Sequence, residues 1–253
     1  MKTFLDRERP IITGMLKSKT KQELLSEIQR LREQGVEAYG FQMEGIAQEI
    51  KAREPLAEIF HAMSDKPVYV TNYLRCNSTE GIDWHTLGEQ LLMAVELGAT
   101  LVDIPADMFD SSDMELSTKE AAIEEQRQLI ARIRSMGGQI LMSSHVLRYV
   151  PQATVLSIAA QHKARGADIS KIVTEANSRE EACENFIIQS VLERDLGLKH
   201  LFLCNGTHCR VHRHVAPLLG SCMFLTVENA LTGQNQPTVA EAIEALRVVE
   251  HGI

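Results

Sequence analysis

Residues 167–173 read ADISKIV, a short strand-like run that follows Gly166 and precedes a helix-like stretch beginning near Asn177. Parallel strands that are buried on both faces are normally near-continuous Val, Ile and Leu, so the lysine at the centre of this run, Lys171, is unexpected. A buried ammonium group is costly unless it is paired with a charge or loses its proton, and the neutral amine is a nucleophile. Lys171 is therefore a candidate for a lysine that forms a Schiff base.

The rest of the chain repeats this alternation of strand-like and helix-like segments. Apolar runs that predict strands alternate with runs whose apolar residues recur at helical spacing and end at glycine. The predicted strands lie at 11–15, 37–43, 67–73, 100–105, 139–145, 167–173, 200–206 and 221–227. The predicted helices lie at 19–34, 44–63, 84–97, 118–136, 152–165, 179–196 and 238–250. Such alternation over about 250 residues favours an α/β protein with a (β/α)8 TIM barrel, with a doubly wound open sheet as the alternative.

The domain organisation follows from the absence of any break in this pattern. No low-complexity run, composition shift or linker divides the sequence. The phosphate-binding signatures GxGxxG and GxxxxGK, typical of nucleotide-binding sheets, do not occur either. We therefore expect residues 1–253 to form a single (β/α)8 barrel domain.

Charge and cysteine content restrict the partners and the compartment. The formal net charge of -8 argues against nucleic acid or an anionic membrane as a partner, although an anionic small molecule needs only a local positive pocket. The five cysteines include no CxxC pair, which favours free thiols in a reducing cytosol. The N-terminus lacks the apolar run of a signal peptide, and no segment approaches transmembrane length. We expect a cytoplasmic protein.

The carboxyl ends of the strands are where a barrel of this kind carries its active site. His145 ends the strand before that of Lys171, so we expect the two side chains to be neighbours. An amine beside a histidine fits imine chemistry, because the amine attacks a ketone while the imidazole moves protons. Glu80, in the loop after the third strand, could orient that histidine. Structural interpretations compete with these roles, since a strand lysine often extends to solvent and a loop glutamate is usually solvated.

Residues 207–214 read THCRVHRH and invite comparison with a metal site. The possible zinc ligands are His208, Cys209, His212 and His214. However, the stretch has no CxxC or HExxH frame, and no second cluster completes a set of four ligands, so we expect no metal. Arg210 and Arg213 in the same stretch could instead bind a substrate carboxylate.

Four short motifs, in order along nearly the whole chain, resemble the type I 3-dehydroquinate dehydratases, which are (β/α)8 enzymes with a Schiff-base lysine. The motifs are RCNSTEG at 75–81, ILMSSH at 140–145, GADISKI at 166–172 and HRHVAPLLGS at 212–221. The resemblance implies that Lys171 forms the imine, that His145 moves protons and that Glu80 is the partner of the histidine. The residues that it implies for substrate binding are Arg213, Arg75, Gln236, Thr232 and, on the second strand, Gln42.

The chain departs from the family pattern at a few positions. The family's second strand usually carries a Glu-x-Arg pair that binds the ring hydroxyls, and the corresponding positions here are Gly40 and Gln42. Val146 stands where the family usually has Asp after the histidine, and Asn205 replaces a common methionine. Buried polar groups dominate discrimination between substrates, so the loss of the Glu-x-Arg pair leaves the identity of the substrate open.

The resemblance implies a hydro-lyase that dehydrates 3-dehydroquinate to 3-dehydroshikimate in the shikimate pathway of aromatic amino acid biosynthesis. It also implies a homodimer, a small keto acid as substrate, and no metal or organic cofactor. One alternative is a different Schiff-base lyase or aldolase on the same scaffold, acting on another keto acid. A second alternative, from another class, is a non-catalytic barrel that binds a ligand.

Overall fold

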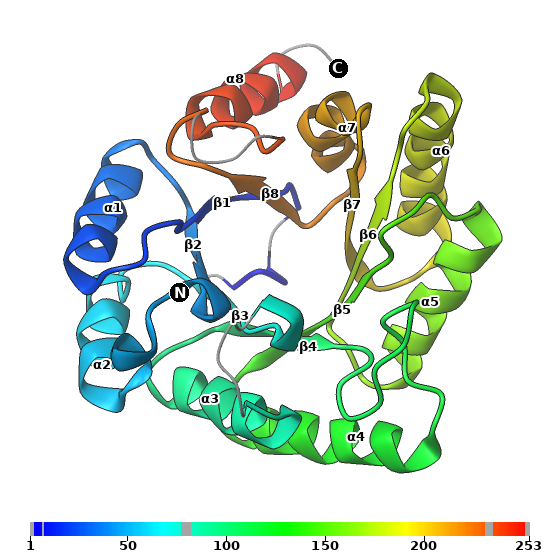
Figure 1. The fold of residues 1–253 in the computed structure, drawn as a ribbon. Helices are drawn as coiled ribbons and strands as arrows, with labels where there is room; N and C mark the ends of the chain where they lie inside the picture. Colours follow the sequence, from blue (N-terminus) through cyan, green and yellow to red (C-terminus); the bar gives the residue numbers. More distant parts are fainter. Residues whose placement is uncertain (1–2, 7, 77–81, 231–234, 251–253) are drawn as a thin grey trace.

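The fold is a ring of eight parallel strands surrounded by helices, seen in Figure 1 along the strands. The computed structural model describes residues 3–6, 8–76, 82–230 and 235–250. The strands are β1 Ile11–Met15, β2 Ala38–Gln42, β3 Val68–Thr71, β4 Leu101–Pro105, β5 Gln139–His145, β6 Ile169–Glu175, β7 Lys199–Asn205 and β8 Met223–Thr226. The helices are α1 Lys21–Glu33, α2 Arg53–Ala62, α3 Trp84–Glu96, α4 Glu120–Ser135, α5 Gln152–Ala164, α6 Arg179–Asp195, α7 Cys209–Val215 and α8 Val239–Glu250.

The strand pairing decides between the two architectures that the sequence left open. Neighbouring strands pair in chain order from β1 to β7, and β8 pairs with β1. The backbone N–H of Cys222, next to β8, donates to the carbonyl oxygen of His200 on β7 at 2.9 Å, which connects the two ends of the sheet. The prediction of a (β/α)8 barrel is confirmed, and the alternative of a doubly wound open sheet is wrong.

Alternating side chains along each strand divide the core into two parts. Leu141, Ile169 and Val173 belong to an apolar cluster inside the barrel, whereas Met142 and Ile172 belong to the cluster between the strands and the helices. This is the period of two that a pleated strand imposes. Because Lys171 shares the parity of Ile169 and Val173, its side chain points into the barrel.

The N-terminal segment covers the end of the barrel opposite the strands' carboxyl ends. Phe4 is fully buried in the interior cluster. Nearby, the side-chain amide of Gln139, the first residue of β5, donates to the hydroxyl of Thr3 at 2.9 Å. The carboxyl ends of the strands are therefore the end at which a ligand can reach the interior.

The predicted element bounds differ from the observed ones in a few places. The strand predicted at 167–173 lies at Ile169–Glu175. Asp168 precedes it, because the carboxylate of Asp168 accepts the N–H of Ile140 on the neighbouring strand at 2.8 Å. Gly166, with φ of 97°, ends α5 in the left-handed region that glycine tolerates best. The helix predicted at 44–63 begins as two 3-10 turns, at Met43–Gly45 and Gln48–Lys51, before α2. The stretch 207–214 lies largely in the short helix α7, which the sequence did not predict.

Candidate active site

Strand register places the two central residues of the site. In the β5–β6 pair, Ser143 lies opposite Lys171 and His145 lies opposite Val173. All four residues have the parity that faces the barrel interior, so His145 lies one inward-facing position nearer the mouth than Lys171. The expectation that these two side chains are neighbours agrees with this arrangement, since both line one cavity of about 220 Å³.

Lys171 is buried with only 6% of its side chain exposed, and it has three hydrogen-bond partners. Its Nζ lies 3.0 Å from Oδ2 of Asp103, 2.6 Å from the hydroxyl of Tyr73 and 3.1 Å from the hydroxyl of Tyr69. Both tyrosines donate to the same oxygen of Asp103, which is itself fully buried on β4. The ion pair accounts for a lysine in the middle of a buried strand, because it offsets the desolvation of both charges.

Burial shifts the proton equilibrium of Lys171 toward the neutral amine relative to a lysine in water. Burial lowers the pKa of Lys171 below its usual range, and the charge of Asp103 opposes that shift only in part. Burial also raises the pKa values of Tyr69 and Tyr73 well above the ordinary value, so both phenols keep their protons and remain donors to Asp103. A lysine with a lowered pKa supplies an unprotonated nucleophile nearer neutral pH.

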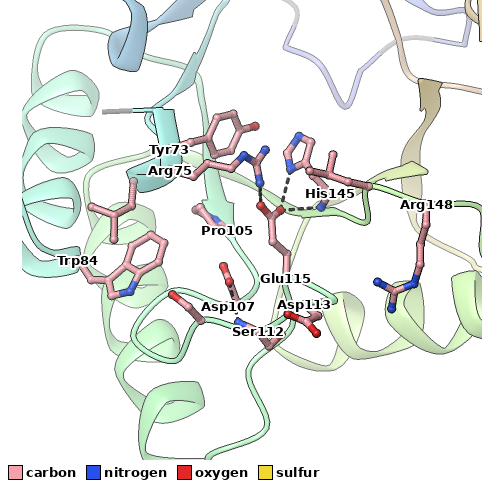
Figure 2. Close-up of a pocket in the computed structure, with 13 residues that line it drawn as sticks. Tyr73, Arg75, Trp84, Pro105, Asp107, Ser112, Asp113, Glu115, His145 and Arg148 are labelled. Carbon is pink, nitrogen blue, oxygen red and sulfur yellow. Dashed lines mark hydrogen bonds and ion pairs between the residues drawn. The ribbon is translucent and has the colours of Figure 1, made fainter. Parts of the chain in front are cut away.

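His145 is the last residue of β5, and its ring packs edge-on against Tyr73 with the centroids 5.0 Å apart. Burial, reinforced by the positive charges of Lys171 and Arg75, lowers the pKa of His145 well below its ordinary value. The ring is therefore neutral at pH 7 and can accept a proton. Its Nδ1 lies 2.8 Å from a carboxylate oxygen of Glu115, a residue of the loop between β4 and α4 (Figure 2).

Most of the predicted substrate-binding residues line the same cavity. These residues are Gln42, Arg75, Arg213 and Gln236. Two predicted residues, Glu80 and Thr232, lie outside the described residues, so the structure neither places nor excludes them. The roles of all these residues stay predictions.

Arg213 and Arg75 are held in different ways. Nε of Arg213, on α7, donates to the carbonyl oxygen of Cys204 at 2.8 Å, and its terminal nitrogen donates to Oδ1 of Asn205 at 2.7 Å. Asn205 thus has a structural role at the position where the sequence departs from the family: its amide orients the arginine. Arg75 forms an ion pair with Glu115 and lies over the ring of Tyr73 at 5.1 Å from the centroid.

The β2 side of the cavity has a different composition. A Cβ atom on Gly40 would lie 2.1 Å from Sδ of Met15, so the methionine fills the space that a side chain at position 40 would need. Oε1 of Gln42 accepts from Nζ of Lys17 at 2.7 Å. The two carboxylate oxygens of Glu44, in the turn after β2, lie 2.9 and 3.0 Å from the hydroxyl of Thr71 and share its single hydrogen, and burial raises the pKa of Glu44.

Several residues of the site were not assigned a role from the sequence. Tyr69 and Tyr73 were detectable, since they lie four residues apart in the predicted strand 67–73 and therefore share its parity, although β3 ends at Thr71. Asp103, in the middle of β4, and Glu44, just after β2, are single polar residues, which is a weak signal alone. Glu115 gave no signal, because a loop residue 30 positions from its partner His145 shows no spacing that predicts contact.

The histidine-rich stretch at 207–214 has a structural arrangement. His212 is buried between the rings of Phe186 and Phe202, with centroid distances of 5.2 and 5.4 Å. His214 contacts the carbonyl oxygen of Arg210 at 2.7 Å within its own helix. In the described parts of the chain, no group of three or more His, Cys, Asp or Glu side chains is arranged to hold a metal ion. None of the helices in those parts is long and apolar enough to cross a membrane.

A larger hollow of about 500 Å³ adjoins the cavity on the other side of His145 (Figure 2). Tyr73, Arg75 and His145 line both spaces. The ion pair of Arg75 with Glu115 and the Glu115–His145 hydrogen bond therefore lie on the boundary between the Lys171 cavity and this outer hollow.

Comparison with known families adds to this geometry. The family model for type I 3-dehydroquinase matches residues 13–253. The chain belongs to the type I 3-dehydroquinase family. It is therefore an enzyme, a hydro-lyase of the dehydroquinase type. No curated protein sequence gives a significant match.

Solved structures of the same family share the fold at low sequence identity. The type I 3-dehydroquinate dehydratase of Clostridium difficile, solved with covalently modified comenic acid, has a TM-score of 0.83 at 13% identity, with 98% of this chain and 95% of that chain covered. The 3-dehydroquinate dehydratase of Geobacillus kaustophilus has a TM-score of 0.81 at 14% identity, with 98% and 96% covered. That of Enterococcus faecalis has a TM-score of 0.75 at 15% identity, with 96% and 95% covered.

Proposed function

We propose that this chain dehydrates 3-dehydroquinate to 3-dehydroshikimate through an imine on Lys171. The observation that carries the proposal is a buried amine whose pKa is lowered and which shares one closed-ended cavity with a neutral histidine. Family membership supports the same reaction.

The steps follow from the positions of the two groups. The amine of Lys171 attacks the ketone carbon of the substrate, and loss of water from the carbinolamine gives a protonated imine. His145 takes a proton from the carbon next to the imine, and the electrons of that C–H bond move into the imine to form an enamine. The enamine electrons then expel the hydroxyl group, which leaves as water with the proton from His145. Hydrolysis of the conjugated imine releases the enone and restores Lys171, so one water is lost in total.

The cations of the cavity suit the carboxylate of the substrate. Arg213 stays charged even though burial lowers its pKa, and Asn205 fixes the direction of its guanidinium group. Gln236 lines the same space and can donate to a bound carboxylate or hydroxyl. Arg75 also faces the cavity, but its ion pair with Glu115 must weaken or be shared for it to bind substrate.

A turnover assay tests the proposal, with formation of the conjugated enone followed by ultraviolet absorbance. The wild-type protein is expected to convert 3-dehydroquinate, whereas Lys171→Met is expected to lower kcat by about 10⁴-fold or more, because the covalent route is lost. Lys119→Ala is the matched control, since Lys119 is an exposed lysine on the rim. A wild-type protein without turnover, or a Lys171→Met variant with undiminished turnover, contradicts the proposal.

The β2 side favours one second candidate, an imine-forming lyase or aldolase for another keto acid. Met15 fills the space beside Gly40, and Gln42 accepts a hydrogen bond from Lys17. The strand β2 therefore carries no acidic and basic pair that could bind a diol. A panel of keto acids, each tested for turnover and for a covalent adduct, separates the two candidates. The third possibility, a ligand-binding barrel without catalysis, is disfavoured because binding alone does not require a buried amine with a lowered pKa.

The family resemblance also underlies our proposals of a homodimer and of a cytoplasmic enzyme in aromatic amino acid biosynthesis. Light scattering of the purified protein at several concentrations tests the dimer, and a mass equal to one chain throughout contradicts it. Fractionation of the source cells tests the compartment.

A further inference from the structure

We infer that Glu115 is the carboxylate that positions His145, a role for which the family resemblance implied Glu80. The inference rests on the proposed function, in which His145 moves the proton, and it concerns which carboxylate sets the state of that ring. Glu115 is a positioning residue in this account, because it acts through the histidine.

The contacts of Glu115 occupy both of its carboxylate oxygens. Oε2 accepts from the backbone N–H of His145 at 2.6 Å and lies 2.8 Å from Nδ1 of the same residue. Oε1 pairs with the guanidinium group of Arg75. Figure 2 shows the carboxylate between the arginine and the histidine, with its side chain rising from the β4–α4 loop. Only 12% of the Glu115 side chain and 11% of the His145 side chain are exposed, so water competes little for these bonds.

These contacts fix the tautomer of His145. An ionised carboxylate only accepts hydrogen bonds, so Nδ1 must carry the hydrogen that it shares with Glu115. Nε2 is then the nitrogen with the free electron pair, as a proton-abstracting base requires. The same carboxylate holds the backbone N–H, which limits rotation of the ring relative to the strand.

A second set of hydrogen bonds holds the backbone of Glu115 from behind. The hydroxyl of Ser144, next to His145, donates to the carbonyl oxygen of Glu115 at 2.6 Å. Because that hydroxyl hydrogen is used, Nε2 of the buried His162 on α5 is the donor to Ser144 at 3.0 Å. Nδ1 of His162 then accepts from the hydroxyl of Ser170, the residue before Lys171, at 2.9 Å. This chain of bonds connects the strands of Lys171 and His145 to the loop of Glu115.

The backbone at Glu115 is in an uncommon conformation. Its φ of 44° lies in the left-handed region, which non-glycine residues seldom occupy. Such conformations persist where the surroundings over-determine them, and they concentrate at functional sites. Here the loop is held by Ser144 on one side and by His145 and Arg75 on the other. The strain is explained if the loop is shaped to present this carboxylate to the histidine.

The tautomer of His145 can be measured without any substrate. Nitrogen NMR of the full-length protein, labelled in its histidines, distinguishes protonated from unprotonated Nδ1, and His145→Gln assigns the signal. We expect Nδ1–H in the wild type. In Glu115→Gln the single amide oxygen cannot accept from Arg75, from the backbone N–H of His145 and from the ring N–H together, so the bond that holds Nδ1–H weakens and the population shifts toward Nε2–H. Glu120→Gln is the matched control, because Glu120 is an exposed glutamate at the start of α4 that pairs with Arg127, and it is expected to leave the His145 signal unchanged.

Turnover supplies the second readout. Glu115→Gln is expected to lower kcat by about 100-fold with KM nearly unchanged, because His145 in the wrong tautomer cannot accept the substrate proton at Nε2, and such proton transfer typically contributes about 100-fold or more. Glu115→Asp, which restores a carboxylate, is expected to recover part of the rate, and the control Glu120→Gln to change it by less than about threefold. Among the described residues, the charged and titratable groups around His145 are Lys171, Arg75, Arg213, His162, Tyr73 and Glu115, so the pH profile of kcat is recorded for each Glu115 variant. Its acid limb moves to lower pH when Glu115 is neutral, because the carboxylate stabilises the protonated ring.

Two results overturn the inference: an unchanged tautomer and kcat in Glu115→Gln, or a larger change in Glu80→Gln than in Glu115→Gln. Failure of the proposed function is a separate outcome. If the wild-type protein does not dehydrate 3-dehydroquinate, the NMR result still decides whether Glu115 sets the tautomer of His145. Thermal melts of each variant exclude loss of the fold as the cause.

Discussion

The β5–β6 side of the barrel mouth agrees with the family's pattern of site residues more closely than the β2 side does. On the β5–β6 side, both Lys171 and His145 have defined partners: Asp103 and two tyrosines for the lysine, Glu115 for the histidine. On the β2 side, Gly40 stands where the family usually has an acidic residue, and the thioether of Met15 fills the space that its side chain would need. The residues proposed for the imine chemistry therefore have their partners. The β2 side, which in the family binds the ring hydroxyls, has a different composition from the family's pattern.

This difference teaches that imine chemistry and substrate recognition depend on separate structural elements. The chemistry depends on a pair of adjacent strands whose register fixes Lys171 opposite Ser143 and His145 one step further. In the proposed mechanism, recognition of the hydroxyl groups depends on the β2 side, where Gln42, Lys17 after β1 and Glu44 after β2 form the polar surface. Recognition of the carboxylate is proposed for Arg213 and Gln236. Substitutions on β2 can therefore change which keto acid is preferred while the imine mechanism persists.

The largest expected effect comes from Asp103→Asn, which removes the charge that balances Lys171. Breaking a buried ion pair typically costs about 3 kcal/mol or more of unfolding free energy, measurable by urea denaturation. Asp103 raises the pKa of Lys171, so its loss lets burial lower that pKa further. Because imine formation needs the neutral amine, the midpoint of its pH profile moves to lower pH.

Asp107→Asn is the control for this prediction. Asp107 is a second buried acid from the same part of the chain, and it accepts the N–H of Ser112 within its own loop. We expect its substitution to leave the midpoint of imine formation unchanged. An equal shift in both variants would show that Asp103 has no special link to Lys171.

A second prediction concerns pH and the hydrogen bonds behind the β5–β6 side. Burial lowers the pKa of His162 from 6.5 to about 3, so its folded-state pKa lies below its unfolded value. The unfolded chain then binds the extra proton first as the pH falls, and stability is lost progressively from about pH 6.5 toward pH 3. Between pH 6.5 and 4 this single residue contributes about 3 kcal/mol of that loss.

Unfolding at several pH values measures this effect, with His162→Gln as the variant. The variant is less stable than the wild type at pH 7 but has a smaller loss of stability on acidification. His200, whose pKa burial lowers to about 4, remains as a second source of acid sensitivity in both proteins. Identical pH dependence in the two proteins would mean that His162 is not held neutral between Ser144 and Ser170.

The smallest expected effect is at Gly40, on the β2 side. A Cβ there meets the end of the flexible Met15 side chain, so Gly40→Ala is expected to cost about 1 kcal/mol while Met15 moves aside. The change is expected in KM more than in kcat, because Gly40 lies on the recognition side. In the double variant with Met15→Ala, the contact is absent and the penalty of the alanine disappears. A large loss of kcat in Gly40→Ala would contradict the separation of the two sides.

Much of the catalytic side could be predicted from the sequence because it depends on short-range rules. The strand period places Lys171 inward, and chain order in a barrel places His145 beside it. The fold was predictable for the same reason, since each strand–helix unit carries its own pattern. The exact bounds of β6 were not, because they depend on a bond between Asp168 and the neighbouring strand.

The parts that could not be predicted depend on loops and on long-range contacts. Glu115 reaches His145 from a loop whose backbone has a positive φ, which no periodic pattern indicates. Gly40 itself was recognised from the sequence as a difference from the family. That Met15 fills the space beside it could not be predicted without knowing how β1 and β2 pack. Tyr69 and Tyr73 are an intermediate case. The alternation of the strand predicts that both face inward, but their contacts with Lys171 cannot be predicted without the register of β3 in the barrel.

The central claim is that Lys171 is the imine-forming nucleophile, and reductive trapping tests it most directly. The wild-type protein is incubated with 3-dehydroquinate and borohydride, digested, and analysed by peptide mass spectrometry. The account predicts one covalent adduct on the peptide that contains Lys171, and none in Lys171→Met. An adduct on a different lysine, or no adduct with 3-dehydroquinate or with any keto acid of the panel, would contradict it.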